Sequence, residues 1–345
     1  MLKDPGVFDI AWVPGDLRHR EDELQTLANS LKRHPHAHTP LRIIGPSGAG
    51  KTAVVRFALD DMDANSRGVQ TAYVDAWDQR RSNRTLYSLL SELSKSTGKL
   101  HPKSKATDLL AGIRDAVDDR AVVVIDEADM IQDADLLVDL HAIDELLLVL
   151  VANRDDDIVE ELGTFQTKTL QDGHRLDFEG YSVDALVDIL RPRAAEGVYG
   201  SVDGAVLESI AERAEGDARN AIKCLEMAVR MADRMGREEL GDDMLLGEAM
   251  ARAQAFVRQK ASERLRREEH IVYDVVRDAR RAQMGEIYPA YRSRAADPKS
   301  ERSVRKWLRK MADYNLIRVE GETADRVYEY IEVPDELVRW LKEPA

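Results

Sequence analysis

Eight residues of the sequence, GPSGAGKT at positions 45–52, have the types and spacing that bind phosphate. They fit the pattern G-x-x-x-x-G-K-[ST] and stand between an apolar stretch typical of a strand, LRIIG (41–45), and a helical pattern. Glycines let such a loop turn tightly, so that backbone N–H groups point at phosphates beside the positive end of the following helix. Lys51 is expected to reach the β- and γ-phosphates, and the Thr52 hydroxyl to ligate Mg²⁺. The residues predicted to bind the nucleotide are Gly45, Pro46, Ser47, Gly48, Ala49, Gly50, Lys51 and Thr52.

Two carboxylates, Asp126 and Glu127, end an apolar run typical of a buried strand, AVVVIDE (121–127). Ionised groups leaving a strand core are costly unless they hold a metal, a water or a cation; two solvated acids are the simpler alternative. Beside a phosphate loop, Asp126 is placed to hold Mg²⁺ through water, and Glu127 to polarise the water that attacks the γ-phosphate. The two segments predict an Mg²⁺-dependent ATPase whose metal ligands are Thr52 and Asp126.

A neutral amide, Asn153, ends another apolar run, LLLVLVAN (146–153). At that position the amide can orient the attacking water and contact the γ-phosphate. A turn-forming Asn after a strand is the alternative. The catalytic residues predicted from these segments are Lys51, Asp126, Glu127 and Asn153.

A group of basic residues near the C-terminus could contact DNA. Residues 277–310 hold 11 Lys and Arg against 4 Asp and Glu, a net charge of +7, although the whole chain carries −14. Spacings of three and four place the cations along one side of a helix, opposite an apolar stripe of Val304, Leu308 and Met311 with Trp307 at its border. The helical residues predicted to bind DNA are Arg302, Arg305, Lys306, Arg309 and Lys310.

Two further arginines, Arg318 and Arg326, lie in predicted strands on either side of a polar turn, Glu322–Asp325, where a wing could reach a minor groove. For the whole basic group, a solvated surface and a module that docks on protein remain the alternatives.

The first half of the chain must hold the phosphate site. Short apolar runs at 41–45, 71–76, 121–127 and 146–153 alternate with helical patterns such as 83–96 and 105–117. This alternation is typical of a parallel sheet covered by helices. The predicted fold class is therefore α/β, with an ATPase domain over residues 1–180.

The rest of the chain has two other patterns. Residues 182–259 are helical throughout, with Ser182 and Ser201 as expected N-caps and Gly197, Gly216 and Gly236 as expected stops. Three helices follow at 268–283, 285–294 and 300–313, and then two strands, 316–321 and 326–333. That order is typical of a winged helix-turn-helix. We therefore predict a helical domain at 181–262 and a winged helix at 263–345, joined by a helical connector.

Length and composition agree with a soluble, multidomain protein. A chain of 345 residues fits two or three domains, and 43% hydrophobic with 33% charged residues is ordinary for a globular protein. The one cysteine, Cys224, excludes an intramolecular disulfide and is expected to be buried. No signal sequence is apparent and no apolar run is long enough for a membrane span, so a cytosolic location is expected. The acidic balance suits a salt-rich cytoplasm, with an ordinary acidic mesophile as the alternative.

The order of these motifs resembles the archaeal replication initiators related to the eukaryotic origin-recognition and cell-division-control AAA+ ATPases. VFDIAWVPGDLRHREDEL (7–24) is similar to the family's N-terminal segment, which implies that His19, Arg20 and Glu21 lie close to the adenine. GDARNAI (216–222) is similar to the sensor 2 motif, which implies that Arg219 binds the γ-phosphate and takes part in catalysis. GEIYPAY, the basic helix and DYNLI resemble the family's winged helix.

The sequence also departs from the family pattern. The segment 129–146 is shorter than in the family, and EELGTFQTKTLQDGHRLDFEGY (160–181) lacks a clear arginine where members carry the finger that completes a neighbour's ATP site. Arg175 and Lys168 are the nearest candidates. The resemblance further implies a helical element after the second strand that contacts DNA, for which Arg80, Arg81 and Arg84 are available.

The resemblance implies an initiator that binds origin-type double-stranded DNA and switches slowly between ATP and ADP. Its further partners would be other copies of itself or a replicative helicase. A mobile-element paralogue or regulator that binds nucleotide and DNA without initiating is the first alternative, and a signalling ATPase whose winged helix contacts protein is the second.

Overall fold

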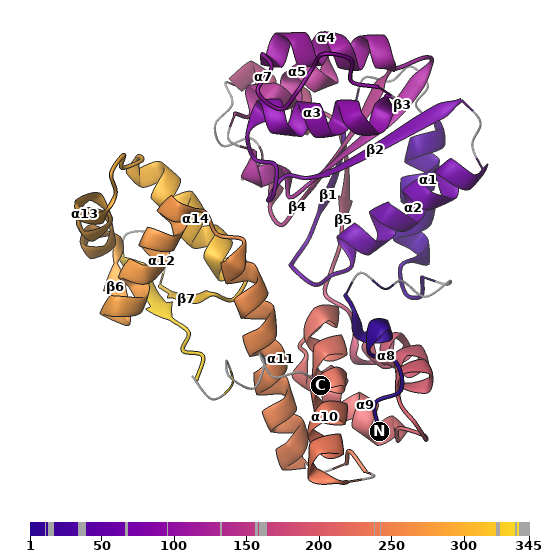
Figure 1. Cartoon of the computed structure of the whole chain (residues 1–345), viewed down its shortest axis with the longest axis vertical. Helices are drawn as coiled ribbons and strands as arrows, with labels where there is room; N and C mark the ends of the chain where they lie inside the picture. The colour runs from indigo at the N-terminus through magenta and orange to yellow at the C-terminus, as the bar shows by residue number, and fades with distance from the viewer. Residues whose placement is uncertain are drawn as a thin grey trace. The chain divides into compact units, whose positions relative to one another are not determined.

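The chain folds into two compact units, Val13–Tyr181 and Met1–Trp12 with Ser182–Ala345. The structure is a computed structural model that describes residues 1–10, 12, 17–33, 39–65, 68–94, 96–131, 133–155, 158, 164–237, 239–241, 243–321, 325–334 and 337. Figure 1 shows the sheet with its helices in violet and magenta, and the helical part that follows in red to yellow.

The first unit is built on a five-stranded parallel sheet in the order β2-β3-β4-β1-β5. Its strands are β1 (Leu41–Ile44), β2 (Val69–Asp75), β3 (Arg120–Asp126), β4 (Leu146–Ala152) and β5 (His174–Asp177). Every residue of β1 and β4 is buried, and β4 is correspondingly an unbroken apolar run, whereas β1 contains one charged residue, Arg42. The four predicted strands are confirmed to within two residues at their ends, whereas β5 was not predicted.

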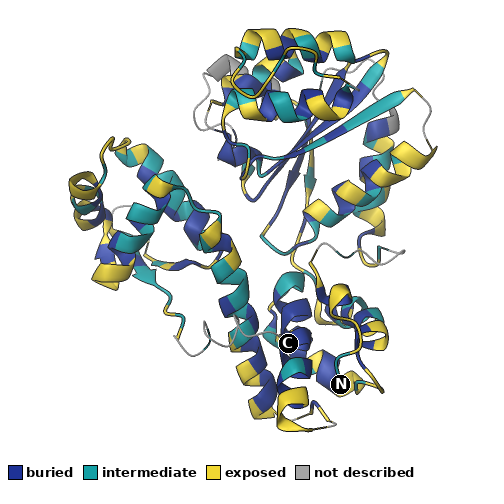
Figure 2. Cartoon of the chain, in the orientation of Figure 1, coloured by how far each residue is buried: buried dark blue, intermediate teal, exposed yellow. Residues whose placement is uncertain are grey.

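Helices cover both faces of this sheet (Figures 1 and 2). Those of the unit are α1 (Glu21–Arg33), α2 (Lys51–Asn65), α3 (Ser82–Leu93), α4 (Ala106–Ala116), α5 (Asp135–His141) and α7 (Thr164–Gln171), with a 3-10 turn η2 at Ala128–Met130. Alternate residues of a strand point to opposite faces, so Val122 and Val124 of β3 pack with α1 and α2. Val123 and Ile125 pack with α3, α4 and α5. These two apolar layers, one on each face of the sheet, hold the strands in place and so position the residues at their carboxyl ends.

The second unit begins with four helices, α8 (Val183–Gly197), α9 (Gly204–Arg213), α10 (Ala218–Met235) and α11 (Asp243–Glu263), together with a 3-10 turn η1 at Pro5–Phe8. Ser182 caps α8 as predicted, since its side chain accepts from the backbone N–H of Ala185. The predicted cap Ser201 is wrong: Asp203, two residues later, caps α9 because its carboxylate accepts from Ala205. Gly236 ends α10 in the left-handed conformation, as expected.

The winged-helix order is confirmed in the C-terminal part. It contains α12 (Arg267–Ala279), α13 (Met284–Arg294), α14 (Glu301–Asp313) and an antiparallel sheet of β6 (Arg281–Gln283), β8 (Val327–Tyr330) and β7 (Ile317–Glu320). The prediction that the first helix continues to residue 283 is wrong, because Arg280 turns to φ 61° and the chain enters β6. Of the predicted polar turn, residues 322–324 lie outside the described part of the chain.

Two smaller expectations concern burial and membranes. Cys224 is buried in α10, as expected, and burial raises the pKa of its thiol to about 12. Across the described parts of the chain, no helix combines the length and the apolar character that a membrane span requires. The predicted domain boundaries at 180 and 262 stay predictions.

Candidate nucleotide site and basic helix

The phosphate loop lies between β1 and α2 and depends on its glycines. Gly48 and Gly50 have φ values of 81° and 86°, which other residues rarely adopt. A Cβ atom on Gly50 would lie 2.1 Å from the Tyr181 hydroxyl, and one on Gly45 would lie 2.3 Å from the carbonyl oxygen of Phe178. The loop is therefore held in a conformation that only these glycines allow.

Lys51 is buried inside the loop that it ends. Its Nζ donates hydrogen bonds to the carbonyl oxygens of Gly45 at 2.7 Å and Pro46 at 2.9 Å, and to Oδ1 of Asn153 at 3.1 Å. The structure thus brings together two predicted site residues that lie about a hundred positions apart in the sequence. Among the described residues, the buried Nδ2 of Asn153 has no hydrogen-bond partner. A buried amide donor left in this way is typical of a site that a ligand completes.

Asp126 ends β3 beside the start of α2. Its Oδ2 accepts from the Thr52 hydroxyl at 2.6 Å, and its Oδ1 accepts from the backbone N–H of Glu127 at 2.9 Å. Burial raises the pKa of Asp126 to about 6, and the neighbouring Glu127 adds to this shift. Glu127 adopts a left-handed φ of 54°, a conformation that is uncommon for residues other than glycine and that the surrounding structure must impose.

The residues fit an Mg²⁺ ion that is held together with phosphates. Mg²⁺ takes hard oxygen ligands and is usually bound by one or two protein groups, substrate phosphates and water. Thr52 and Asp126 supply hydroxyl and carboxylate oxygens in contact with each other. No group of three or more His, Cys, Asp or Glu side chains that could hold a metal ion occurs among the described residues.

The sequence interpretation missed Tyr73, whose hydroxyl donates to Oδ2 of Asp126 at 2.7 Å. Tyr73 lies on β2, which pairs with β3 so that Tyr73 is opposite Val124 and Asp75 opposite Asp126. Burial raises the pKa of the Tyr73 hydroxyl, and the carboxylate of Asp126 raises it further. A tyrosine two residues before the end of the neighbouring strand was the one signal available in the sequence.

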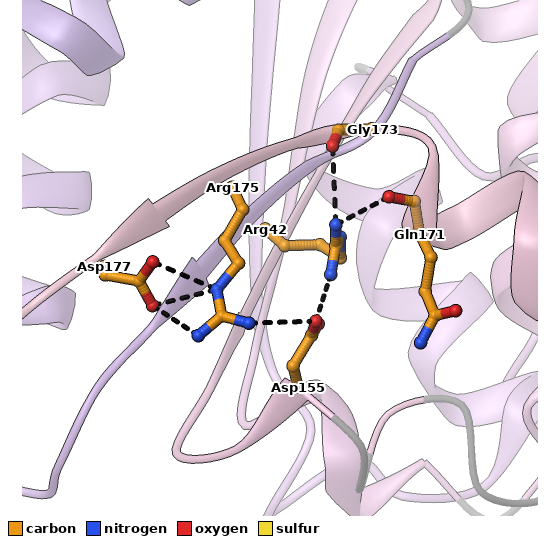
Figure 3. Close-up of polar contacts among 6 residues, drawn as sticks. All are labelled: Arg42, Asp155, Gln171, Gly173, Arg175 and Asp177. Atoms are coloured by element: carbon orange, nitrogen blue, oxygen red, sulfur yellow. Dashed lines mark hydrogen bonds and ion pairs between the residues drawn. The ribbon is translucent and has the colours of Figure 1, made fainter.

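An ion-pair network connects β1, β5 and the residues that follow β4 (Figure 3). Arg42 is buried and forms an ion pair with Asp155, while its Nη2 donates to the carbonyl oxygens of Gln171 and Gly173. Arg175, which is paired with Arg42 across the strands, binds Asp177 at 2.6 Å and approaches Asp155 at 3.5 Å. Asp155 thus balances two adjacent cations.

The network bears on the arginine-finger candidates. The guanidinium of Arg175 is bonded within its own chain, to Asp177 and Asp155. Lys168 is exposed on α7. Part of the segment in which family members carry the finger, residues 160–163, lies outside the described residues. A finger role for either residue stays a prediction.

Replacement of Asp155 with Ala is expected to destabilise the first unit by about 3 kcal/mol, because it leaves the buried Arg42 charge without its carboxylate. Urea unfolding of the full chain measures this change. Asp177→Ala is the matched control: it removes a partner of the half-exposed Arg175 and should cost less than about 1 kcal/mol. Equal losses for the two variants would show that burial of Arg42 does not decide the effect.

Arg20 connects the N-terminal segment to the residues after β5. Its guanidinium lies over the rings of Tyr181, at 4.1 Å from the centroid, and Phe178, at 5.1 Å. It also donates to the carbonyl oxygen of Glu179 at 2.6 Å. His19 and Glu21 are exposed. Arg20 thereby supports Tyr181 against Gly50, while the expected contact of this segment with adenine stays a prediction.

The sensor 2 candidate Arg219 lies in the first turn of α10. Asp217 caps this helix, and its carboxylate also binds Nη2 of Arg219 at 2.9 Å. The Arg219 guanidinium lies 5.6 Å from the ring centroid of Tyr314, the residue that follows α14. The predicted γ-phosphate ligand is therefore in contact with the winged helix.

The basic helix is α14, and its predicted surface is partly correct. Arg302 is exposed, whereas Arg305, Lys306 and Arg309 are half-buried; Arg305 pairs with Glu301 at 2.5 Å. Lys310 was predicted to face DNA, and this is wrong: it is buried, and its ammonium lies 5.2 Å from the ring centroid of Tyr314. Tyr314 follows it by four residues and so covers the same side of the helix.

Three predicted cations outside α14 have different surroundings. Arg318 pairs with Glu329 on the neighbouring strand at 3.4 Å, and Arg326, just before β8, is half-buried. Arg80 was suggested as a DNA contact, and this is wrong: it is buried and donates from Nε to the carbonyl oxygen of Trp77 at 3.0 Å. Arg81 and Arg84, which follow it, are exposed.

Models of two known domain families match this chain. The model of the AAA domain matches residues 34–158, and that of the Cdc6 AAA+ ATPase-type lid domain matches residues 187–245. The chain is 32% identical to ORC1-type DNA replication protein 9 of Halobacterium salinarum over 341 residues, 96% of this chain and 94% of the relative. It is 31% identical to ORC1-type DNA replication protein 1 of the same organism over 310 residues, 88% and 100% of the two chains.

Solved structures share the fold. The Aeropyrum pernix ORC1 protein, solved in complex with DNA, superposes with a TM-score of 0.70 and 23% identity over 96% of this chain and 94% of the other. The Aeropyrum pernix ORC2 protein, solved as ADPNP-ADP complexes, gives a TM-score of 0.61 and 22% identity over 98% and 96%. At these identities the similarity shows the fold: a parallel-sheet ATPase domain, a helical lid and a C-terminal winged helix.

Proposed function

Because the chain belongs to the family of ORC1-type DNA replication proteins, which are AAA+ ATPases, we propose that it is an initiator that binds double-stranded DNA and switches slowly between ATP and ADP states. The relatives are replication proteins by name, and a protein of the same fold was solved with DNA. The chain has, in addition, its own phosphate loop and basic helix, which support this proposal.

ATP hydrolysis is assigned to the residues around Lys51. The Lys51 ammonium, now bonded to loop carbonyls and Asn153, would turn to the β- and γ-phosphates. Nδ2 of Asn153, which has no hydrogen-bond partner among the described residues, would donate to the γ-phosphate or the attacking water, and Glu127 would accept that water's proton. Thr52 and Asp126 would hold Mg²⁺, which neutralises part of the phosphate charge when bound.

The contact of Arg219 with Tyr314 carries the proposal of a switch. In the structure, Arg219 is held by Asp217 and lies over the Tyr314 ring. If the γ-phosphate attracts this guanidinium, Arg219 must leave Tyr314, and the packing at the end of α14 changes. Arg219 would thus couple the binding of ATP to the position of α14, the helix to which we assign DNA binding.

DNA binding is assigned to α14 and the wing, with Arg81 and Arg84 as exposed cations on the ATPase unit. Association with further copies of the chain and recruitment of a replicative helicase stay predictions, as does a cytosolic location. A paralogue that binds DNA without initiating would have the same nucleotide and DNA sites. Footprinting on genomic DNA separates the two: protection of an AT-rich repeat cluster supports an initiator, and protection at promoters alone supports a regulator.

Arg219→Ala is expected to leave ADP affinity nearly unchanged and to weaken ATP binding by about 1.5–3 kcal/mol, because one charge-assisted contact to the γ-phosphate is lost. The difference in DNA affinity between the ATP and ADP states should shrink with it. Calorimetry and fluorescence anisotropy measure the two effects.

Arg191→Ala serves as the control for this prediction, because it removes an exposed arginine from α8 of the same unit. It should change neither nucleotide nor DNA binding. Equal losses of ADP and ATP affinity in Arg219→Ala would show that Arg219 only stabilises the lid.

A further inference from the structure

We propose that Tyr73 is a positioning residue for the metal site: its hydroxyl, together with that of Thr52, holds the Asp126 carboxylate in the orientation that binds Mg²⁺ with ATP. The inference rests on the proposed ATPase function and adds a residue that the P-loop and the acidic pair do not include. The positioning group comes from the neighbouring strand β2.

The hydrogen bonds to Asp126 leave its carboxylate little freedom. The Thr52 hydroxyl at 2.6 Å and the Tyr73 hydroxyl at 2.7 Å both donate to Oδ2, and the backbone N–H of Glu127 donates to Oδ1. A carboxylate has about four lone-pair positions, so these described donors occupy three of them. The fourth position, on Oδ1, has no donor among the described residues. Without Tyr73, Oδ2 would regain one acceptor position and the carboxylate could rotate.

Tyr73 is itself fixed from two sides. The guanidinium of Arg56, on α2, lies 4.6 Å from its ring centroid. Its backbone N–H donates to the carboxylate of Glu92 on α3, so the edge strand is tied to a helix. A cation over the ring withdraws electron density from the phenol, which strengthens its hydroxyl as a donor. The hydroxyl is therefore a pre-positioned group rather than a mobile surface side chain.

This role predicts an effect on Mg²⁺ rather than on ATP as such. In Tyr73→Phe the ring and its packing remain, but Asp126 loses one donor. Groups that orient metal ligands typically affect metal affinity by 10-fold or more, so we expect the gain in ATP affinity on adding Mg²⁺ to fall about tenfold. Affinity for ATP in EDTA should stay the same. The measurement is calorimetric titration of the full chain with ATP, with excess Mg²⁺ and with EDTA.

Two further variants make the test specific. Tyr87→Phe removes a hydroxyl from a half-buried tyrosine that packs on the opposite face of the sheet, and it should leave both affinities unchanged. In an Asp126→Asn background, Tyr73→Phe should have no additional effect on the Mg²⁺-dependent gain. A full additional loss in that background would overturn the proposal, because Tyr73 would then act independently of Asp126.

The outcomes also separate this inference from the proposed ATPase function. If the wild type binds ATP with an Mg²⁺-dependent gain that Tyr73→Phe retains, only the role of Tyr73 is wrong. If Tyr73→Phe lowers the melting temperature and weakens ATP binding equally with and without Mg²⁺, the residue is structural. If the wild type itself shows no ATP binding, the proposed function fails first.

Discussion

Lys51→Ala is expected to abolish measurable ATP binding. The Lys51 ammonium is buried within the phosphate loop, and its removal takes away the charge that we propose binds the β- and γ-phosphates. Two charge-assisted contacts of about 1.5 kcal/mol each correspond to a loss of at least about 100-fold in affinity. Calorimetry with Mg²⁺ and ATP measures it, and Lys99→Ala, an exposed lysine of the same unit, is the control.

Glu127→Gln should separate binding from hydrolysis. The amide keeps the size of the side chain but cannot accept a proton from water, so nucleotide binding should persist while turnover falls about 10²–10⁴-fold. A folded protein that binds ATP without hydrolysing it would also show that the loss in Lys51→Ala is local. Comparable ATP affinity of the wild type and Lys51→Ala would refute the assignment of the phosphate loop.

The ATPase unit could be predicted largely because its signals are local. Parallel strands buried on both faces read as apolar runs, as β4 and the stretch Ala121–Ile125 of β3 do, and β1 is apolar except for Arg42. The phosphate loop must follow β1 because the pattern of glycines and Lys51 requires a strand before it and a helix after it. The proximity of Asn153 to Lys51 follows from the register, since β4 pairs with β1 and both end at the same edge.

The elements that escaped prediction are short, polar and held by tertiary contacts. β5 (HRLD) and β6 (RAQ) have no apolar alternation; each forms a strand because a neighbour provides an open edge. Two cations are buried against aromatic rings: the Lys310 ammonium lies over the ring of Tyr314, and the Arg80 guanidinium lies over the ring of Trp77. Residue type and spacing do not show such pairs, because a buried Lys or Arg looks the same in the sequence as a solvated one.

The same distinction applies to the functional contacts. Spacing identified Asp126, but the approach of Tyr73 to it depends on the pairing of β2 with β3. The family motif suggested Arg219, but its contact with Tyr314 joins residues almost a hundred positions apart. Coupling between nucleotide and DNA, if it passes through these residues, therefore lies in contacts that only the fold creates.

Double replacement of Arg302 and Lys306 with Ala is expected to weaken binding to duplex DNA on the order of 100-fold at low salt, if each loses one charge-assisted contact of about 1.5 kcal/mol. The two residues are four apart on α14, away from the buried Val304 and Leu308. Two lost phosphate contacts should also lower the slope of log K against log salt by about two. Anisotropy titrations of the full chain over a range of salt concentrations measure both quantities.

The control for this prediction must remove the same charge from elsewhere. Arg191 and Lys260 are exposed cations on α8 and α11, and their double replacement with Ala changes the net charge equally. If α14 enters a groove, that control should leave the salt dependence unchanged, whereas the Arg302 and Lys306 variant should lower the slope by about two. Weakening on all sequences alike marks phosphate contacts, and weakening confined to a preferred site marks readout of bases, worth about 1–3 kcal/mol per bidentate pair. Identical effects of the two double variants would mean that only overall charge matters, and α14 would then be reassigned as a surface that docks on protein.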